Sequence, residues 1–218
     1  MFGQTLYVQW KWNRDFLAFY TALAFAAPLL ILWIALPHLG LSSARELVRV
    51  GEVVGITVGS IAVVAGVTIA WQGYAIDDRA GHIYALSLPI TRSRALAIRA
   101  ATALLILVLP ATGVWLGALL ATGQVTMPPT LHGYAGALAA RALLASWLAH
   151  ACMFALRYSA GRRARLALAL IALLMSAGSA VAITAPGTRI VFSHAADFII
   201  SNPGPFGAIF GRWTLIDV

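Results

Sequence analysis

The chain has 218 residues, of which 61% are hydrophobic and only 10% charged, and its mean hydropathy is +0.87. A soluble domain of this composition would expose large apolar patches, so the composition excludes a water-soluble protein. The net charge of +8 does not indicate nucleic-acid binding, because the arginines form short clusters between apolar runs rather than one basic face.

Five apolar stretches are long enough to cross a bilayer, because about 20 helical residues span a hydrocarbon core of about 30 Å. They are residues 16–36, 53–75, 96–121, 134–156 and 165–185. The sequence predicts an all-α polytopic bundle that forms one transmembrane domain over residues 1–218. The pairs Gly55/Gly59 and Gly113/Gly117 are each spaced four apart, which favours close helix packing but also arises by chance in Gly/Ala-rich spans.

Residues 1–15 mix apolar and polar side chains ahead of the first span. Trp10, Lys11, Trp12 and Arg14 are the expected interfacial anchors. Two interpretations fit equally well, namely a helix lying in the membrane interface or an aromatic belt at the start of the first span.

The tail, residues 186–218, is apolar in pieces but is interrupted by Asn202-Pro203-Gly204-Pro205. Neither side of this interruption is long enough to span, so short helices in the outer leaflet are expected. The final WTLIDV suggests the start of a sixth span, which would return the C-terminus to the cytoplasm.

Basic residues are distributed unequally between the two predicted sides of the membrane. Ten lie with the N-terminus and the second and fourth connections, and four lie with the first connection and the tail. Because short loops rich in Lys and Arg stay cytoplasmic, the N-terminus is predicted to be cytoplasmic in a multi-pass protein of the inner (plasma) membrane.

Chemistry-bearing residues are scarce in the predicted spans. No Asp or Glu lies in any of them, so the buried carboxylates of ion-coupled carriers are missing. Lys11 is the only lysine and Cys152 the only cysteine, which excludes a P-loop, a Schiff-base lysine and a cysteine-based metal site. The sequence predicts no catalytic residues, metal site or cofactor in this chain.

Arg141 and His150 are the ionisable residues of the fourth span. Arg141 is expected to extend to the outer interface or to contact a substrate in a cavity. His150 is expected to be a neutral, hydrogen-bonded residue or part of a substrate path. Their separation of nine residues, 2.5 helical turns, directs them to opposite faces.

The second connection, residues 76–95, is longer and more charged than a helix reversal requires, which favours contact with a cytoplasmic partner. A short amphipathic helix is expected over Ala80–Leu88, stopped by Pro89, and Thr91 or Ser93 is expected to cap the third span. This connection contains an acid, a glycine, two apolar positions, a Pro-Ile-Thr-Arg motif and a further arginine. They are Asp78, Gly81, Ile83, Leu86, Pro89-Ile90-Thr91-Arg92 and Arg99.

This pattern resembles the cytoplasmic loop of the permease subunits of type-2 ATP-binding-cassette (ABC) exporters. The resemblance implies a coupling helix that contacts cytoplasmic ABC ATPase subunits through Asp78, Gly81, Ile83, Leu86, Pro89 and Arg92. It also implies ATP and Mg in the partner rather than in this chain, and a second permease subunit, identical or different. His82 and Tyr84 depart from the pattern, and only five of the family's six spans are visible.

Three functional classes remain to be compared. A permease with Ala-, Val-, Leu-, Ser- and Thr-rich spans would favour an apolar or amphipathic substrate. An intramembrane enzyme would need convergent polar groups at bilayer depth, which the spans lack apart from His150 and scattered serines. A non-transporting scaffold or anchor subunit of a larger complex would need only the apolar spans, and the loop pattern is the feature that separates it from a permease.

Overall fold

The computed structural model describes residues 2–35, 44–79, 91–159 and 215–217. The chain divides into two compact units, one formed by Met1–Phe154 with Trp213–Val218 and the other by Ala155–Arg212. Of the second unit, the description covers only Ala155–Ser159 at the end of a helix. All helix packing below lies within the first unit.

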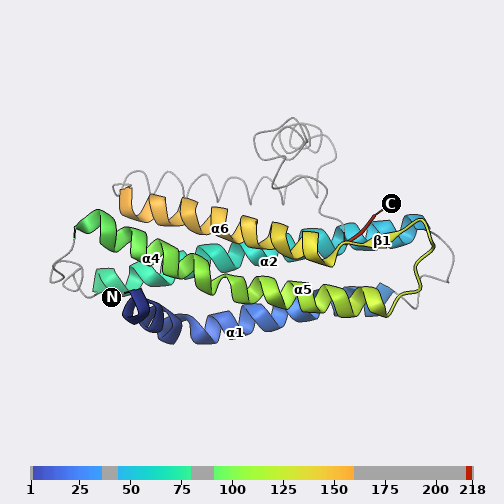
Figure 1. Ribbon diagram of the computed structural model, residues 1–218, viewed down its shortest axis with the longest axis horizontal. Helices are drawn as coiled ribbons and strands as arrows, with labels where there is room; N and C mark the ends of the chain where they lie inside the picture. The colour runs from blue at the N-terminus through green and yellow to red at the C-terminus, as the bar shows by residue number, and fades with distance from the viewer. Residues whose placement is uncertain (1, 36–43, 80–90, 160–214, 218) are drawn as a thin grey trace, which may run out of the picture. The chain divides into compact units, whose positions relative to one another are not determined.

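Five helices and two short strands make up the described part of the chain (Figure 1). In chain order these are α1 (Phe2–Ala35), α2 (Ala44–Arg79), α4 (Arg92–Ile106), α5 (Val108–Gly123), β1 (His132–Gly133), α6 (Ala135–Ser159) and β2 (Ile216–Asp217). Helix accounts for 89% of these residues, so the predicted helical class is confirmed apart from the two strands.

Four segments are long and apolar enough to cross a membrane: Phe2–Ala35, Ala44–Gly73, Ser93–Gly123 and Ala135–Leu156. They correspond to the first four predicted spans, and α4 and α5 together make the third. The predicted fifth span, 165–185, and the predicted outer-leaflet helices lie outside the described residues.

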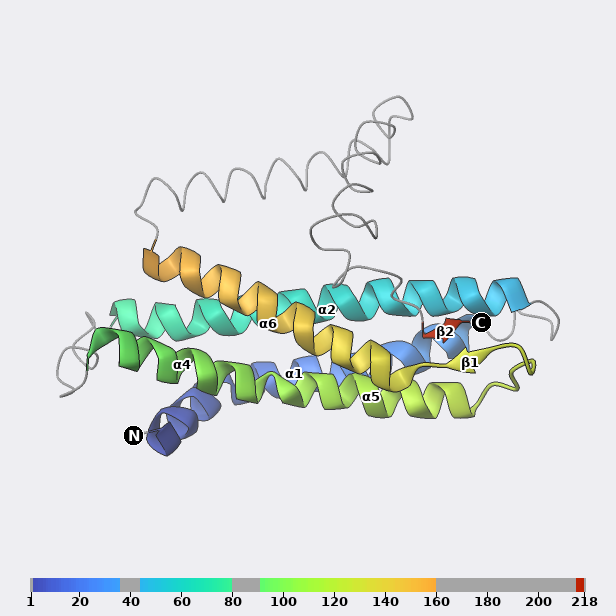
Figure 2. The same cartoon turned by 45° about the horizontal axis from the view of Figure 1, so that its top comes forward.

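The helices of the first unit alternate in direction. α1 and α4–α5 run one way, whereas α2 and α6 run the other (Figures 1 and 2). Side-chain hydrogen bonds link neighbouring helices. Tyr20 of α1 lies 3.0 Å from Thr68 of α2, and Trp147 Nε1 of α6 donates to the carbonyl oxygen of Leu104 of α4 at 3.0 Å.

Glycine sets the two closest helix approaches. A Cβ on Gly113 would lie 2.7 Å from the carbonyl oxygen of Thr21, and one on Gly117 would overlap the carbonyl oxygen of Phe25. The predicted close packing through Gly113/Gly117 is therefore confirmed, with α1 as the neighbour. Gly66 of α2 does the same toward α6, where a Cβ would overlap the carbonyl oxygen of Ser146.

Many large apolar side chains lie on the outside of the bundle, and small residues are frequent inside it. Trp33, Ile56 and Leu120 are 69%, 68% and 52% exposed, whereas buried positions are often alanine. The fully or nearly buried alanines include Ala24, Ala65, Ala103, Ala118 and Ala145. Such a distribution suits lipid as the surrounding solvent, because helices in a bilayer associate by close packing of small residues rather than by hiding large apolar ones.

The third predicted span, 96–121, lies within the single candidate span Ser93–Gly123. It is interrupted at Leu107, between α4 and α5. The physical reason is Pro110, which has no N–H to donate to the carbonyl of Ile106 and whose ring crowds that carbonyl.

The first predicted boundary is also different. Residues 1–15 and 16–36 were predicted as separate segments, but α1 continues through both of them, and its first turns stand at an angle to the rest (Figure 2). No Gly or Pro stands between Gln4 and Ala27 to stop the helix. An interfacial position for residues 1–15 stays a prediction.

The last described residues form a short strand. Ile216–Asp217 make up β2, which pairs antiparallel with β1 in the register His132↔Asp217 and Gly133↔Ile216, and a sixth span after them stays a prediction. Leu215 and Ile216 are fully buried. They pack where Gly51 of α2 leaves room, because a Cβ on Gly51 would lie 2.9 Å from the nitrogen of Ile216.

Candidate functional site

One end of the first unit, here called the basic end, is formed by the start of α1, the end of α2 and the start of α4 (Figure 1). Six basic residues belong to it: Lys11, Arg14, Arg79, Arg92, Arg94 and Arg99. At the opposite end Arg45 and Arg49 alternate with Glu46 and Glu52 in the first turns of α2. The two ends of the unit therefore differ strongly in their content of basic residues.

The predicted coupling residues enclose the connection between α2 and α4 at the basic end. Asp78 lies in the last turn of α2 and Arg92 is the first residue of α4. α2 continues to Arg79 and α4 begins at Arg92, so both ends of the predicted 76–95 loop are helical. Gly81, Ile83, Leu86 and Pro89 lie outside the described residues.

α4 begins directly after this connection. Thr91 occupies the N-cap position with an extended backbone, but its hydroxyl makes no capping bond and instead lies 3.4 Å from the hydroxyl of Ser93. The first turn is closed by the Ala95 N–H, which donates to the Thr91 carbonyl at 3.1 Å. Thr91 is therefore the N-cap residue, as predicted, but its side chain does not cap the helix.

A buried polar cluster attaches the start of α1 to α4. Thr102 is fully buried, and its hydroxyl lies 2.7 Å from Gln9 Oε1 and 2.9 Å from the carbonyl oxygen of Arg99. Gln9 Nε2 also donates to that carbonyl, at 3.2 Å. Because these bonds are partly buried between apolar helices, they hold the first turns of α1 to α4 at a defined position.

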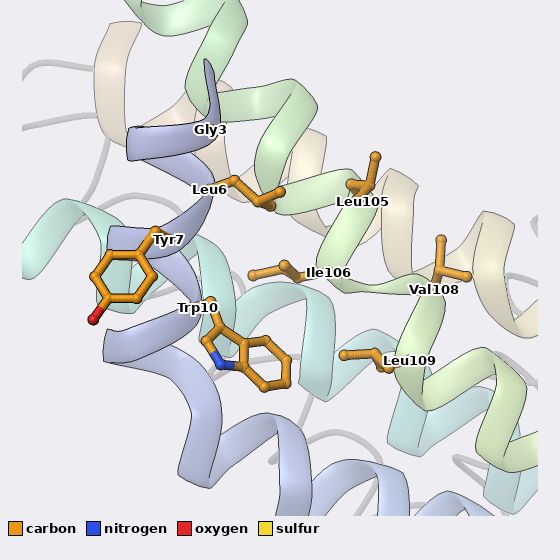
Figure 3. Close-up of a pocket in the computed structure, with 8 residues that line it drawn as sticks. All are labelled: Gly3, Leu6, Tyr7, Trp10, Leu105, Ile106, Val108 and Leu109. Atoms are coloured by element: carbon orange, nitrogen blue, oxygen red, sulfur yellow. The ribbon is translucent and has the colours of Figure 1, made fainter. Parts of the chain in front are cut away.

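An apolar groove lies beside this attachment, between the first turns of α1 and the α4/α5 break (Figure 3). Its volume is about 590 Å³, within the range of about 300–1,000 Å³ usual for ligand pockets. It is lined by Gly3, Leu6, Tyr7, Trp10, Leu105, Ile106, Val108 and Leu109. Leu6 and Trp10 face Ile106 and Leu109 across it, while the Tyr7 hydroxyl points away.

The predicted anchors belong to the first turns of α1. Trp10, Lys11, Trp12 and Arg14 are all exposed, and Arg14 pairs with Asp15 at 3.2 Å. Trp12 and Trp33, 40% and 69% exposed, are 21 residues apart, or about 32 Å along a helix. That spacing fits two aromatic belts on either side of a hydrocarbon core of about 30 Å.

Arg141 and His150 do not meet. Arg141 is half-buried near the start of α6, and no bond links its side chain to the described residues. His150 is only 2% exposed, faces the backbone of α2 at Gly66 and stacks on Phe154 with ring centroids 5.8 Å apart. By strict hydrogen-bond geometry neither ring nitrogen has a partner in the described part of the chain, and the expected hydrogen bond from His150 to a neighbouring helix stays a prediction.

Sequence reasoning missed Gln9, Thr102 and the break at Leu107. Pro110 was a readable signal for the break, since proline interrupts the helix that precedes it. The pairing of Gln9 with Thr102 joins residues 93 apart in the chain and had no local signal. Among the described residues, no group of three His, Cys, Asp or Glu side chains could hold a metal ion.

No known protein family, curated protein or solved structure matches the chain.

Proposed function

We propose that the chain is the membrane-spanning permease subunit of an ABC transporter of the type-2 exporter class. It moves an apolar or amphipathic substrate with ATP hydrolysed by separate cytoplasmic subunits, and it acts with a second permease subunit, identical or different. The observation that carries the proposal is the position of the loop pattern: Asp78 lies in the last turn of one helix of the basic end, and Arg92 is the first residue of the next.

The packing of α4 supports a coupling role for this connection. α4 is a regular helix of 15 residues between the connection and the break at Leu107. Gln9 and Thr102 attach it to α1, and Trp147 attaches it to α6. A displacement applied at residues 80–91 would therefore be transmitted along α4 to two other helices, and the break at Leu107 is a natural place for α4 to move relative to α5.

The charges of the basic end support a cytoplasmic position for the same connection. Short segments rich in Lys and Arg remain cytoplasmic, which is where ATPase subunits are found. In this proposal the chain binds no ATP itself and belongs to an inner (plasma) membrane with a cytoplasmic N-terminus.

The test is the ATPase activity of the complex purified through a tag on this chain and reconstituted in proteoliposomes. Asp78→Arg, Leu86→Asp and Pro89→Gly are expected to abolish hydrolysis that depends on the permease, because they alter the contact with the ATPase. Glu52→Arg is the matched control, since it reverses an exposed acidic charge at the other end of α2 and is expected to leave hydrolysis unchanged.

Two outcomes would contradict the proposal. Full ATPase activity in all three loop variants, each inserted in the membrane at the native level, would exclude coupling through this loop. Recovery of the chain in a stable complex that contains no ATPase would favour a non-transporting scaffold subunit.

A further inference from the structure

We propose that the groove between the start of α1 and the α4/α5 break binds one acyl chain of an anionic membrane phospholipid, whose headgroup lies against Lys11 and Arg14. This inference concerns a different surface from the ATPase contact and does not depend on it. It rests on the lining of the groove, on its position in the bundle and on the charges next to it.

The lining is suited to a hydrocarbon chain and to little else. Leu6, Ile106 and Leu109 present aliphatic carbon, and Trp10 directs its six-membered ring toward Leu109 (Figure 3). The polar atom of Tyr7 points out of the groove. A polar ligand would find little polar surface there and would lose its own hydration, whereas an acyl chain has no hydration by hydrogen bonds to lose.

The position of the groove makes lipid its natural occupant. Leu105, Val108 and Leu109 lie inside the candidate span Ser93–Gly123 and are 54%, 38% and 37% exposed. In a bilayer these surfaces contact hydrocarbon. The bonds from Gln9 to Thr102 and to the Arg99 carbonyl fix the start of α1 beside these surfaces.

Charges next to the groove select the headgroup. Lys11 and Arg14 each follow a lining residue by one helical turn, since they stand four residues after Tyr7 and Trp10. Both side chains are exposed, and Lys11 has no ion pair within the described residues. A phosphate at the level of Lys11 can thus be bound while its acyl chain extends into the groove, with basic residues near a membrane favouring anionic lipid.

Gly3 provides a way to fill the groove without disturbing the helices. A Cβ built on Gly3 meets no other atom within 4 Å, so Gly3→Phe places a ring in the open space. Gly136 in the first turn of α6 has the same freedom and lies outside the groove lining, which makes Gly136→Phe the matched control.

The experiment uses the full chain in vesicles of phosphatidylcholine containing a minority of phosphatidylglycerol. Bromine atoms, which quench tryptophan, are placed on the acyl chains of one lipid at a time. Brominated phosphatidylglycerol is expected to quench more than its share of the bilayer predicts, and this excess is expected to vanish in Trp10→Phe. Gly3→Phe is expected to remove the excess and Gly136→Phe to retain it.

A second pair of variants separates the headgroup from the acyl chain. Lys11→Gln and Arg14→Gln leave the lining intact and are expected to lower the preference for phosphatidylglycerol by about fivefold for each charge. Arg45→Gln, at the opposite end of α2, is expected to leave it unchanged. Equal quenching by the two brominated lipids in the native chain would overturn the proposal. So would an excess that persists in Gly3→Phe, or a preference for phosphatidylglycerol that is the same in Lys11→Gln, in Arg14→Gln and in the native chain.

Discussion

At the scale of single residues, His150 and Trp147 of α6 pose a contrast that can be measured. Trp147 donates its indole N–H to the carbonyl of Leu104 at 3.0 Å, whereas His150 is buried with both ring nitrogens unpartnered in the described part of the chain. Buried polar atoms without partners cost free energy, and replacing them with apolar atoms of similar shape removes that cost. Replacement by phenylalanine is therefore expected to change the free energy of unfolding differently at the two positions.

We expect His150→Phe to leave the free energy of unfolding unchanged or to raise it. Trp147→Phe is the comparison variant and is expected to lower it by about 1 kcal/mol through the lost hydrogen bond, and by more through the smaller ring. Thermal unfolding of the purified chain in detergent measures both. A larger loss for His150→Phe than for Trp147→Phe would show that the ring nitrogens are paired in the folded protein and would revive a role in a substrate path.

Gly117 gives a second prediction at this scale. A methyl group on Gly117 would overlap the carbonyl oxygen of Phe25, so Gly117→Ala requires α1 and α5 to move apart. The expected loss is about 1–3 kcal/mol of unfolding free energy, as for other overpacked contacts. Gly123→Ala, whose Cβ meets nothing within 4 Å, is expected to be neutral or stabilising. Equal stability of the two variants would contradict the close α1–α5 contact.

At the scale of elements, the start of α1 is held to α4 chiefly by Gln9. Gln9→Leu removes the bonds to Thr102 and to the Arg99 carbonyl and leaves Thr102 with the Arg99 carbonyl alone. We expect faster amide hydrogen exchange over residues 2–12, because local opening of this segment becomes easier. Gln4→Leu, at an exposed position of the same helix, is expected to change nothing. Unchanged exchange in Gln9→Leu would mean that apolar contacts alone hold the segment.

The elements also show what the sequence could and could not predict. Apolar length alone located the first four spans, because lipid demands about 20 apolar residues whatever the tertiary contacts are. It could not locate the ends of α2, which extends to Ala44 and Arg79 beyond the apolar run since helical hydrogen bonding does not depend on hydrophobicity. It also could not show β2, because the pairing with β1 and the contact with Gly51 join distant parts of the chain.

The candidate site was also predictable only where local composition is informative. Trp10 and Lys11 are predicted anchors on their local composition; Trp10 lines the groove and Lys11 is the next residue along the chain. The groove itself depends on the angle of the first turns of α1 and on the break at Leu107, neither of which a hydropathy pattern encodes.

At the scale of the whole molecule, the distribution of charge predicts which end of the first unit is cytoplasmic. The basic end carries twice as many Lys and Arg residues as the opposite end, even when Arg141 is counted with the latter. Thr91 before α4 and Thr126 after α5 lie at opposite ends of the candidate span Ser93–Gly123. Both side chains are exposed, which makes them matched positions for a labelling experiment.

We expect Thr126→Cys to react with a membrane-impermeant maleimide added to intact cells and Thr91→Cys to react only after the membrane is permeabilised. Both variants are made in a Cys152→Ser chain, because Cys152 is the single native cysteine and is exposed on α6. The Cys152→Ser chain itself is the control and should not react. The reverse pattern would place the basic end outside, where residues 80–91 could not contact a cytoplasmic ATPase, so this measurement tests the orientation on which the proposed function depends.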